Sequence, residues 1–212
     1  MVRTVTEFRS GPYWEARYRQ GGTSGAGSYG RLAQFKANVI NAFVADNRIT
    51  SVMDLGCGDG NLLSMLDLPA YVGVDVSAAA LARCAARFPQ YRFVPLEMID
   101  AAPSAELAMS IDVIFHLVED PVFVAYMAAL FGHATRFAVF YSSNFAAVPP
   151  DAHVRHRRFT DYIEKTYPAW RLLCHLPNRY PYERAEPSTT SFADFFIYGC
   201  SGEACVIRLP AA

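Results

Sequence analysis

The 212-residue sequence lacks three features that would point to particular classes of protein: paired cysteines, an excess of positive charge, and a long unbroken hydrophobic run. Its five cysteines show neither CxxC pairs nor zinc-ligand spacing, which favours reduced thiols in the cytoplasm. A net charge of -1 provides no broad positive field, so we expect no nucleic-acid partner. The most apolar stretch, residues 107–134, is interrupted by acidic residues, and residues 2–7 lack the apolar core of a signal peptide. We therefore expect a soluble, cytoplasmic protein without membrane contact.

The composition is that of one globular domain. With 52% hydrophobic and 18% charged residues, the chain is long enough to bury a full core and short enough to form one unit. Within residues 1–212 we expect an amino-terminal segment over residues 1–30, a core over residues 31–145, and an insertion with carboxy-terminal strands over residues 146–212.

Short β-rich runs alternate with helical patterns, as in parallel sheets whose strands are joined by crossover helices. Five strands are predicted at residues 51–55, 71–77, 91–98, within 106–117 and at 136–143. Helices are predicted at residues 31–47, 61–66, 78–88 with Ser77 as N-cap, from Pro121 onward, and at 159–168. WRLLCHLP and SFADFFIYGC read as further strands, and EACVIRLP reads either as an added edge strand or as part of a hairpin around Ser201-Gly202. The pattern predicts a doubly wound α/β fold.

Glycine recurs at every second position at the end of VMDLGCGDG, residues 52–60. The simplest explanation is a strand-to-helix turn in which glycine permits positive φ. The context favours a ligand instead, because the glycines follow a predicted strand, precede a predicted helix, and are followed by Asp75 at the end of the next strand. Nucleotide-like ligands lie over the carboxyl ends of parallel strands, where a carboxylate accepts both ribose hydroxyls.

The spacing of these glycines excludes two classes of nucleotide site. A dinucleotide fingerprint, GxGxxG, requires glycine at position 61, where this chain has Asn61. The lysine of a triphosphate-binding P-loop is also absent, since GDGNLL stands where that motif would have GK[ST]. We therefore expect a ligand without a pyrophosphate, which disfavours an NAD-type oxidoreductase.

Three motifs together resemble the class I S-adenosylmethionine-dependent methyltransferases: DLGCGDG at 54–60, VGVDVS at 72–77 and SIDVIFHL at 110–117. The resemblance covers roughly residues 30–145. It implies a Rossmann-like, mostly parallel seven-stranded sheet with helices on both faces and an antiparallel last strand, and S-adenosyl-L-methionine as cofactor. At the exit of the third strand, Glu97 or Asp100 would lie near the adenine, and Ile99 with Asp100 is preferred. By this resemblance the cofactor-binding residues of the core would be Asp54, Gly56, Gly58, Gly60, Asp75, Val76, Ile99, Asp100, Ser110 and Ile111.

The segment YWEARYRQGGTSGAGSYG, residues 13–30, is either a flexible linker or a lid. Its large aromatic side chains favour a lid, because they are costly to leave in a solvated tether, and members of the resembled family commonly fold such a segment over the cofactor. We expect Tyr13, Trp14, Arg17 and Tyr29 near the ligand. The Arg17 guanidinium is suited to the methionyl carboxylate.

The chemistry of methyl transfer needs a base only if the acceptor must lose a proton. His116, just past the fourth strand, is a candidate base for a hydroxyl, and a purely structural role is the alternative. HVRHRR at 153–158 is either a solvated loop or a site for an anionic group, to which Tyr162 would add stacking surface. The predicted substrate-binding residues are His153, Arg155, His156 and Tyr162. Because the fifth strand ends in Ser142-Ser143-Asn144, without an Asp-Asn pair, we predict no metal.

These observations predict a methyltransferase that acts on a small molecule or saccharide, anionic acceptors included. Oxygen is the expected acceptor atom. Nitrogen and carbon acceptors stay open, as does assembly into a homodimer. The alternatives are a catalytically silent module that binds S-adenosylmethionine and, less favoured, the oxidoreductase.

Overall fold

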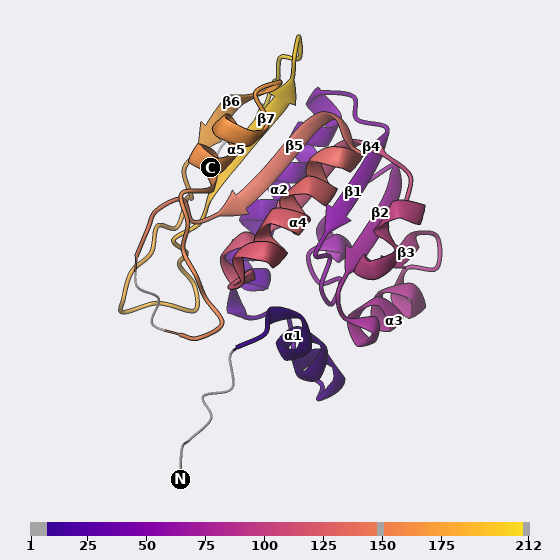
Figure 1. The fold of residues 1–212 in the computed structure, drawn as a ribbon, viewed down its shortest axis with the longest axis vertical. Coiled ribbons are helices and arrows are strands. Elements are labelled where there is room, and N and C mark those ends of the chain that lie inside the picture. Colours follow the sequence, from indigo (N-terminus) through magenta and orange to yellow (C-terminus); the bar gives the residue numbers. More distant parts are fainter. Residues whose placement is uncertain (1–7, 148–150, 210–212) are drawn as a thin grey trace.

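The computed structural model describes residues 8–147 and 151–209, in which a seven-stranded sheet lies between two layers of helices (Figure 1). The strands lie in the order β3-β2-β1-β4-β5-β7-β6. Strands β1 to β5 pair in parallel, whereas β7 is antiparallel to both β5 and β6, so the predicted doubly wound, mostly parallel fold is confirmed. The strands are β1 (Ser51–Leu55), β2 (Ala70–Asp75), β3 (Arg92–Pro95), β4 (Ala105–Ile111), β5 (Ala134–Ser142), β6 (Trp170–Leu176) and β7 (Asp194–Cys200).

The helices mostly follow the sequence pattern. The α-helices are α1 (Ser10–Arg19), α2 (Gly30–Asp46), α3 (Ala78–Arg87), α4 (Asp120–His133) and α5 (Phe159–Thr166), and the short 3₁₀ turns are η1 (Ala26–Ser28), η2 (Leu63–Met65), η3 (Leu96–Ala101) and η4 (Ile114–His116). The predicted cap of α3 is confirmed, because the Ser77 hydroxyl accepts a hydrogen bond from the Ala80 amide. The helix predicted at 61–66 is only the turn η2, since Pro69 and the start of β2 leave no room for more.

Two hydrophobic cores cover the two faces of the sheet. On one face, Val39 and Phe43 of α2 pack with Val52 and Phe137. On the other face, α4 and α5 pack against the sheet, for example through Met127 and Phe159 (Figure 1). Central strands are therefore buried on both sides, which explains the nearly continuous apolar run in β4.

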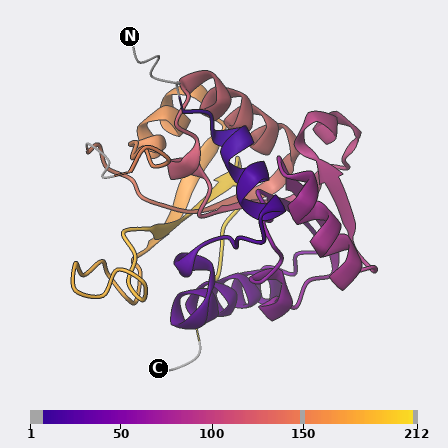
Figure 2. The same ribbon diagram turned by 90° about the horizontal axis from the view of Figure 1, so that it is seen from below.

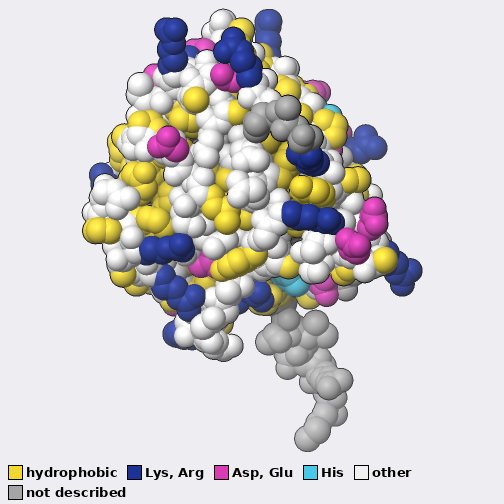
Figure 3. Space-filling view, turned by 180° about the vertical axis from the view of Figure 1, so that it is seen from behind, with side chains coloured by type: hydrophobic (Ala, Val, Ile, Leu, Met, Phe, Trp, Pro, Cys, Tyr) yellow, Lys and Arg dark blue, Asp and Glu magenta, His cyan; other side chains and the backbone are white. Residues whose placement is uncertain are grey.

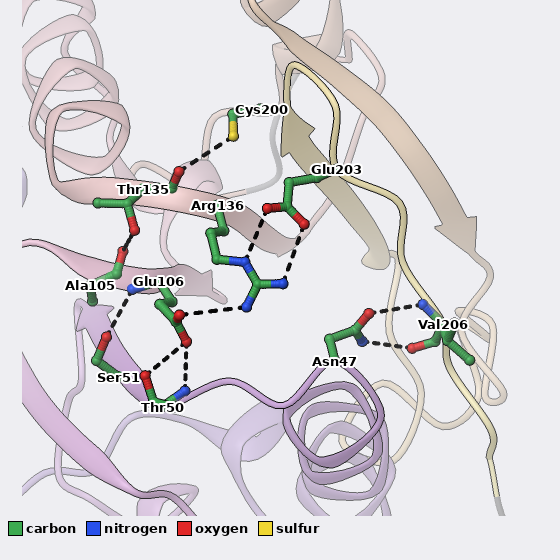
Figure 4. A network of polar contacts seen from close by, with 10 residues as sticks. All are labelled: Asn47, Thr50, Ser51, Ala105, Glu106, Thr135, Arg136, Cys200, Glu203 and Val206. Atoms are coloured by element: carbon green, nitrogen blue, oxygen red, sulfur yellow. Dashed lines mark hydrogen bonds and ion pairs between the residues drawn. The ribbon is translucent and has the colours of Figure 1, made fainter.

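The carboxy-terminal residues do not add a strand to the sheet. A turn does form at Gly202, but residues 203–209 are irregular. Figure 4 shows how side chains hold them: Glu203 accepts two hydrogen bonds from Arg136, and the Asn47 side chain bonds both the amide and the carbonyl of Val206. Because these bonds direct the main chain toward the end of α2, neither the added edge strand nor a second hairpin arm forms.

The amino-terminal helix lies across the edge of the sheet formed by the carboxyl ends of its parallel strands. Figure 2, which views the molecule from that side, shows α1 crossing the middle of this surface. The order of the strands reverses between β1 and β4, and ligands of open α/β sheets bind at such a switch point. The fold therefore places a covered crevice where the glycine motif ends.

Several expectations lie beyond what the structure describes or tests. Residues 1–7 of the predicted lid segment, the two prolines at 149–150 and residues 210–212 lie outside the described residues. No helix in the described part of the chain combines the length and hydrophobicity that a membrane span requires. On the face seen in Figure 3, Lys and Arg side chains are interspersed with acidic and hydrophobic ones, and the absence of a nucleic-acid partner stays a prediction.

Candidate active site

A cavity of about 980 Å³, its open mouth included, lies beneath α1 at the ends of β1, β2 and β4. Its walls come mainly from the lid, the glycine turn after β1, the end of β2, and the connection from β4 to α4, with Leu96 after β3 and Val122 and Tyr126 of α4 completing them. Among the lining residues are Trp14, Tyr18, Ser24, Asp54, Gly56, Gly58, Asp75, Val76, Leu96, Ile111, Asp112 and His116.

Main-chain atoms of the glycine turn lie open to this cavity. The positions of the turn have no room for a side chain. Gly56 has φ +92°, and a Cβ atom at this position would collide with the side chain of Val113. Gly58 has φ +59°, and its Cβ would lie 2.5 Å from the Ser24 hydroxyl oxygen of the lid. Both the conformation and the space therefore require glycine. Gly60 serves packing instead, since its Cβ would approach Cys84 and Phe88 to 2.9 Å, and it does not line the cavity.

Asp75 ends β2 with a buried carboxylate facing the cavity. It accepts hydrogen bonds from the amides of Gly58, at 2.9 Å, and Ser77, at 2.8 Å. Burial outweighs these bonds and raises the pKa of Asp75 to about 6. The side chain is thus fixed in position, with oxygen lone pairs left for a donor such as a ribose hydroxyl.

Asp54 presents an unsatisfied carboxylate oxygen. Its Oδ2 atom accepts a hydrogen bond from the Tyr71 hydroxyl at 3.1 Å, whereas its buried Oδ1 atom has no partner among the described residues. Burial raises the pKa of Asp54 to about 7. A buried polar atom without a partner is costly, so this oxygen calls for a donor from a ligand. The α-ammonium group of a methionyl moiety meets that need.

A buried ion pair supports the other wall of the cavity. Lys36 of α2 is fully buried, and its ammonium donates to the Asp112 carboxylate and, at 2.9 Å, to the carbonyl of Gly27 in the lid. Asp112 lines the cavity with φ +61°, a conformation that few residues other than glycine adopt. The sequence does not reveal this pair, because its only signal is a lysine on the apolar side of the helix predicted at 31–47.

The lid is ordered and is not a flexible linker. Hydrogen bonds hold its helix, α1, at both ends. Arg83 of α3 donates to the carbonyls of Tyr18 and, at 2.9 Å, Gly22. Glu15 accepts hydrogen bonds from the Ser77 hydroxyl, at 2.6 Å, and the Ala79 amide. At the other end, Ser10 is bonded to the Glu119 carboxylate at the start of α4. The closed lid therefore shields the cavity from water.

The predicted cofactor-binding residues divide into two groups. Those that line the cavity are Trp14, Asp54, Gly56, Gly58, Asp75, Val76 and Ile111. Those that do not are Arg17, Tyr29, Gly60, Ile99, Asp100 and Ser110.

Local contacts and the end of β3 explain why the residues of the second group do not line the cavity. Arg17 donates through Nε to the Thr23 carbonyl, and the Tyr29 hydroxyl donates to Asp59. Ser110 lies beneath the wall, where its hydroxyl is hydrogen-bonded to that of Tyr126 at 2.7 Å. Strand β3 ends at Pro95. The next residue, Leu96, begins η3 and lies at the cavity. Ile99 and Asp100 follow further along η3, which corrects their predicted placement.

His116 lines the cavity within a group of aromatic rings. The Trp14 ring lies 4.8 Å away edge-on, and the His153 ring lies parallel at 5.4 Å. Nδ1 is 2.9 Å from the carbonyl oxygen of His153, and because a carbonyl can only accept, Nδ1 carries the proton. Burial lowers the pKa of His116 to about 4, so the ring is neutral near pH 7 and Nε2 has a free lone pair.

The cationic segment at 153–158 holds its own loop in place. Arg155 donates to the Val118 carbonyl at 2.7 Å and to Asp120. Arg157 donates to the carbonyls of Leu117 and Val118 and also to Asp120. These bonds occupy the guanidinium groups, which corrects the expectation of an anion site there.

The remaining predicted substrate residues are separated from one another. His153 stacks between Tyr13 and His116, with ring centroids 5.2 and 5.4 Å apart. His156 is buried against Ser143, and Tyr162 packs on Phe123 in the core beneath α4. Only His153 of the four therefore lies beside the cavity.

Comparisons with known proteins agree with this geometry. Residues 53–133 match a family model described as a methyltransferase domain. Residues 53–133 thus carry a methyltransferase domain, which supports the resemblance to the class I S-adenosylmethionine-dependent methyltransferases. No protein among the curated sequences matches it significantly.

Several solved structures share the fold of this methyltransferase. The methyltransferase domain of bacterial CtHen1 is 21% identical, with 80% of this chain and 99% of that chain covered and a TM-score of 0.62. Magnesium protoporphyrin IX methyltransferase from Synechocystis PCC 6803, with bound S-adenosylmethionine, is 14% identical over 93% and 100% of the chains, with a TM-score of 0.64. N-methyltransferase NodS from Bradyrhizobium japonicum WM9, with S-adenosylhomocysteine, is 10% identical over 92% and 100%, with a TM-score of 0.65.

The residues of the cavity fit S-adenosylmethionine, the cofactor of the family. Asp75 would hold the ribose hydroxyls, the unpaired Oδ1 atom of Asp54 would accept from the ammonium group, and Val76 and Leu96 would flank the adenine. When bound, the cofactor supplies an electrophilic methyl group on a sulfonium. Within the described residues no group of three His, Cys, Asp or Glu side chains is placed to hold a metal ion, and transfer without a metal stays a prediction.

Proposed function

We propose that this methyltransferase methylates a hydroxyl oxygen of a small molecule, and that His116 takes the proton of that hydroxyl. One observation carries the proposal: His116 lines the cavity, is neutral, and has its proton fixed on Nδ1 by the His153 carbonyl. The Nε2 atom is thereby kept as an acceptor, and it finds no partner in the described part of the chain. The surrounding rings and the lid cover the reacting atoms, which favours alignment of donor and acceptor.

Replacing His116 by Asn tests this role. The Asn amide can still donate to the His153 carbonyl, but it cannot accept a proton from the acceptor. We expect turnover, measured as release of S-adenosylhomocysteine, to fall about a hundredfold. Binding of S-adenosylhomocysteine, measured by calorimetry, should stay within about twofold of wild type.

The matched control is His133→Asn. His133 ends α4 and bonds the carbonyl of Ala129 in its own helix, so this variant should keep wild-type turnover. Wild-type turnover in His116→Asn would contradict the proposal. Tight binding of S-adenosylhomocysteine without turnover of any acceptor would favour the catalytically silent module instead.

A further inference from the structure

The lid helix α1 is connected to His116 through two neighbouring aromatic residues, Tyr13 and Trp14. The Trp14 ring lies edge-on to the His116 ring, with 4.8 Å between the ring centroids. The Tyr13 ring lies nearly parallel to that of His153 at 5.2 Å, and the His153 ring lies nearly parallel to that of His116 at 5.4 Å. Tyr13, His153 and His116 therefore form a ring stack that begins on the lid and ends at the proposed base.

His153 holds the His116 imidazole by two different contacts. Its carbonyl oxygen accepts a hydrogen bond from Nδ1 at 2.9 Å, which fixes the tautomer. Its ring lies against the imidazole with an angle of 11° between the two planes, which restrains the plane of the imidazole. The direction of the Nε2 lone pair depends on both contacts, because it follows from the tautomer and from the orientation of the ring.

The His153 ring is supported by the lid, whereas the main chain that follows it is held by the segment after β4. The Arg155 amide donates to the Phe115 carbonyl at 2.7 Å, and the Arg155 guanidinium donates to the Val118 carbonyl. The His153 ring is half-buried, and Tyr13 of α1 stacks on it. Movement of α1 away from the cavity would therefore leave this main chain in place but remove the support of the His153 ring.

The lid also contributes to the neutral state of His116. Burial lowers the pKa of His116 to about 4, and Trp14 is one of the rings that cover it. Two groups, His153 and Arg17, disfavour the imidazolium form, and Asp112 favours it. Trp14 and Arg17 both belong to α1. Removal of these two side chains would expose the imidazole to water and raise its pKa toward the ordinary value of 6.5.

We propose that closure of the lid completes the proposed base, with Tyr13 as a positioning residue that acts through His153. This inference rests on the proposed function and concerns the control of the same site. While α1 covers the cavity, the ring stack directs Nε2 of His116 toward the acceptor. While α1 is displaced, the imidazole turns and is exposed to water, so it does not act as the base.

This coupling gives the proton of the acceptor a defined path. In the closed state the acceptor oxygen forms a bond to the methyl carbon as the bond from that carbon to sulfur breaks, and the electron pair of the broken bond stays on sulfur. The hydroxyl proton passes to Nε2 of His116. Opening of the lid then exposes the imidazolium to solvent, to which it loses the proton before the next cycle.

The state of the imidazole can be measured by nitrogen NMR without any acceptor. In the complex with S-adenosylhomocysteine, the resonances of His116 should report one tautomer, protonated on Nδ1, and a pKa near 4. Tyr13→Ala should introduce the other tautomer and raise this pKa to about 5 or higher, whereas Tyr13→Phe should keep the wild-type spectrum. The His116→Asn variant assigns the resonances among the five histidines.

Further variants separate the ring stack from a general effect on the lid. His153→Ala removes the ring but keeps the main-chain carbonyl, so it should change the His116 spectrum as Tyr13→Ala does. The double variant should add nothing further, because both residues act through one stack. Tyr182→Ala is the matched control, since Tyr182 is 51% exposed and lies outside the cavity and the stack.

The spectra decide the proposal. A wild-type tautomer and pKa of His116 in Tyr13→Ala would overturn it. A change in Tyr13→Ala that His153→Ala does not reproduce would overturn the route through His153.

Turnover separates this inference from the proposed function. With 2-naphthol and methyl glucoside as hydroxyl probes, release of S-adenosylhomocysteine should show a kcat about tenfold lower in Tyr13→Ala. KM should stay within about twofold of wild type, because Tyr13 is not among the residues that line the cavity. A changed His116 spectrum with wild-type kcat would refute His116 as the base and retain its coupling to the lid. If neither probe is methylated, the spectra alone decide the coupling.

Discussion

Two buried carboxylates define the cofactor site at the scale of single residues. Asp54 and Asp75 follow neighbouring strands, and burial raises the pKa of each, to about 7 and about 6. The protein tolerates them because each can be neutral when no ligand is present. A cationic ligand that donates hydrogen bonds favours their ionised forms, so binding should release protons.

This coupling predicts that the affinity for S-adenosylhomocysteine increases with pH between about 5.5 and 7.5. Below this range both carboxyls are protonated and accept poorly from the ammonium group and the ribose, whereas above it both are ionised. We expect affinity to rise roughly tenfold over the interval. Calorimetry in two buffers of different ionisation enthalpy measures both the affinity and the protons released.

Two variants test whether the buried carboxylates cause this pH dependence. Asp75→Asn should weaken binding and flatten the pH dependence. Asp67→Asn should keep the slope, because Asp67 is an exposed residue that does not line the cavity. The same affinity at pH 5.5 and 7.5 in the wild-type protein would contradict the assignment.

Single residues also mark the limit of what could be predicted from the sequence. Asp54, Gly56, Gly58 and Asp75 were placed at the cavity from the sequence, because their predicted role depends on position relative to strand ends. Arg155 was misassigned because a charge cluster does not reveal that the carbonyl of Val118, distant in the sequence, accepts from its guanidinium group. Lys36 was missed because its partner Asp112 lies on another element.

The lid is the element on which access to the site depends. Arg83 connects it to α3 through the carbonyls of Tyr18 and Gly22, while Ser10 connects it to α4. Such hydrogen bonds from a charged donor are stronger than those between neutral groups. Exchange of the cofactor requires at least one of these connections to open.

Arg83→Met should therefore weaken binding of S-adenosylhomocysteine about tenfold, which corresponds to about 1.4 kcal/mol. It should also speed tryptic cleavage at Arg17 and Arg19 in the absence of ligand. Arg87→Met is the matched control, because Arg87 is exposed one turn further along α3 and only covers the Phe88 ring. Equal binding and equal cleavage of the two variants would refute the role of Arg83.

Elements with a strong local signal were predicted well, and those shaped by their neighbours were not. The first strand was predicted with its bounds, Ser51–Leu55, because an apolar run ends there in glycine. The third strand was predicted too long, because Pro95 and the turn η3 end it after four residues. Residues 203–209 have the composition of a strand, but Asn47 and Arg136 bind them elsewhere.

At the scale of the whole molecule, the two edges formed by the strand ends have different roles. The edge at the start of β1, β4 and β5 is stabilised by polar contacts such as those between Glu106, Thr50 and Arg136 (Figure 4). The opposite edge carries the cavity, and Figure 2 shows α1 of the lid lying across that edge. The alternation of strands and helices predicted this division, because all parallel strands end at the same edge.

A crystal structure of the full chain with S-adenosylhomocysteine tests the central claim most directly. The account predicts the ligand beneath α1, with its ribose hydroxyls on the Asp75 carboxylate and its amino group within hydrogen-bond distance of Oδ1 of Asp54. The ligand bound away from the glycine turn, or held there without contact to either carboxylate, would contradict it.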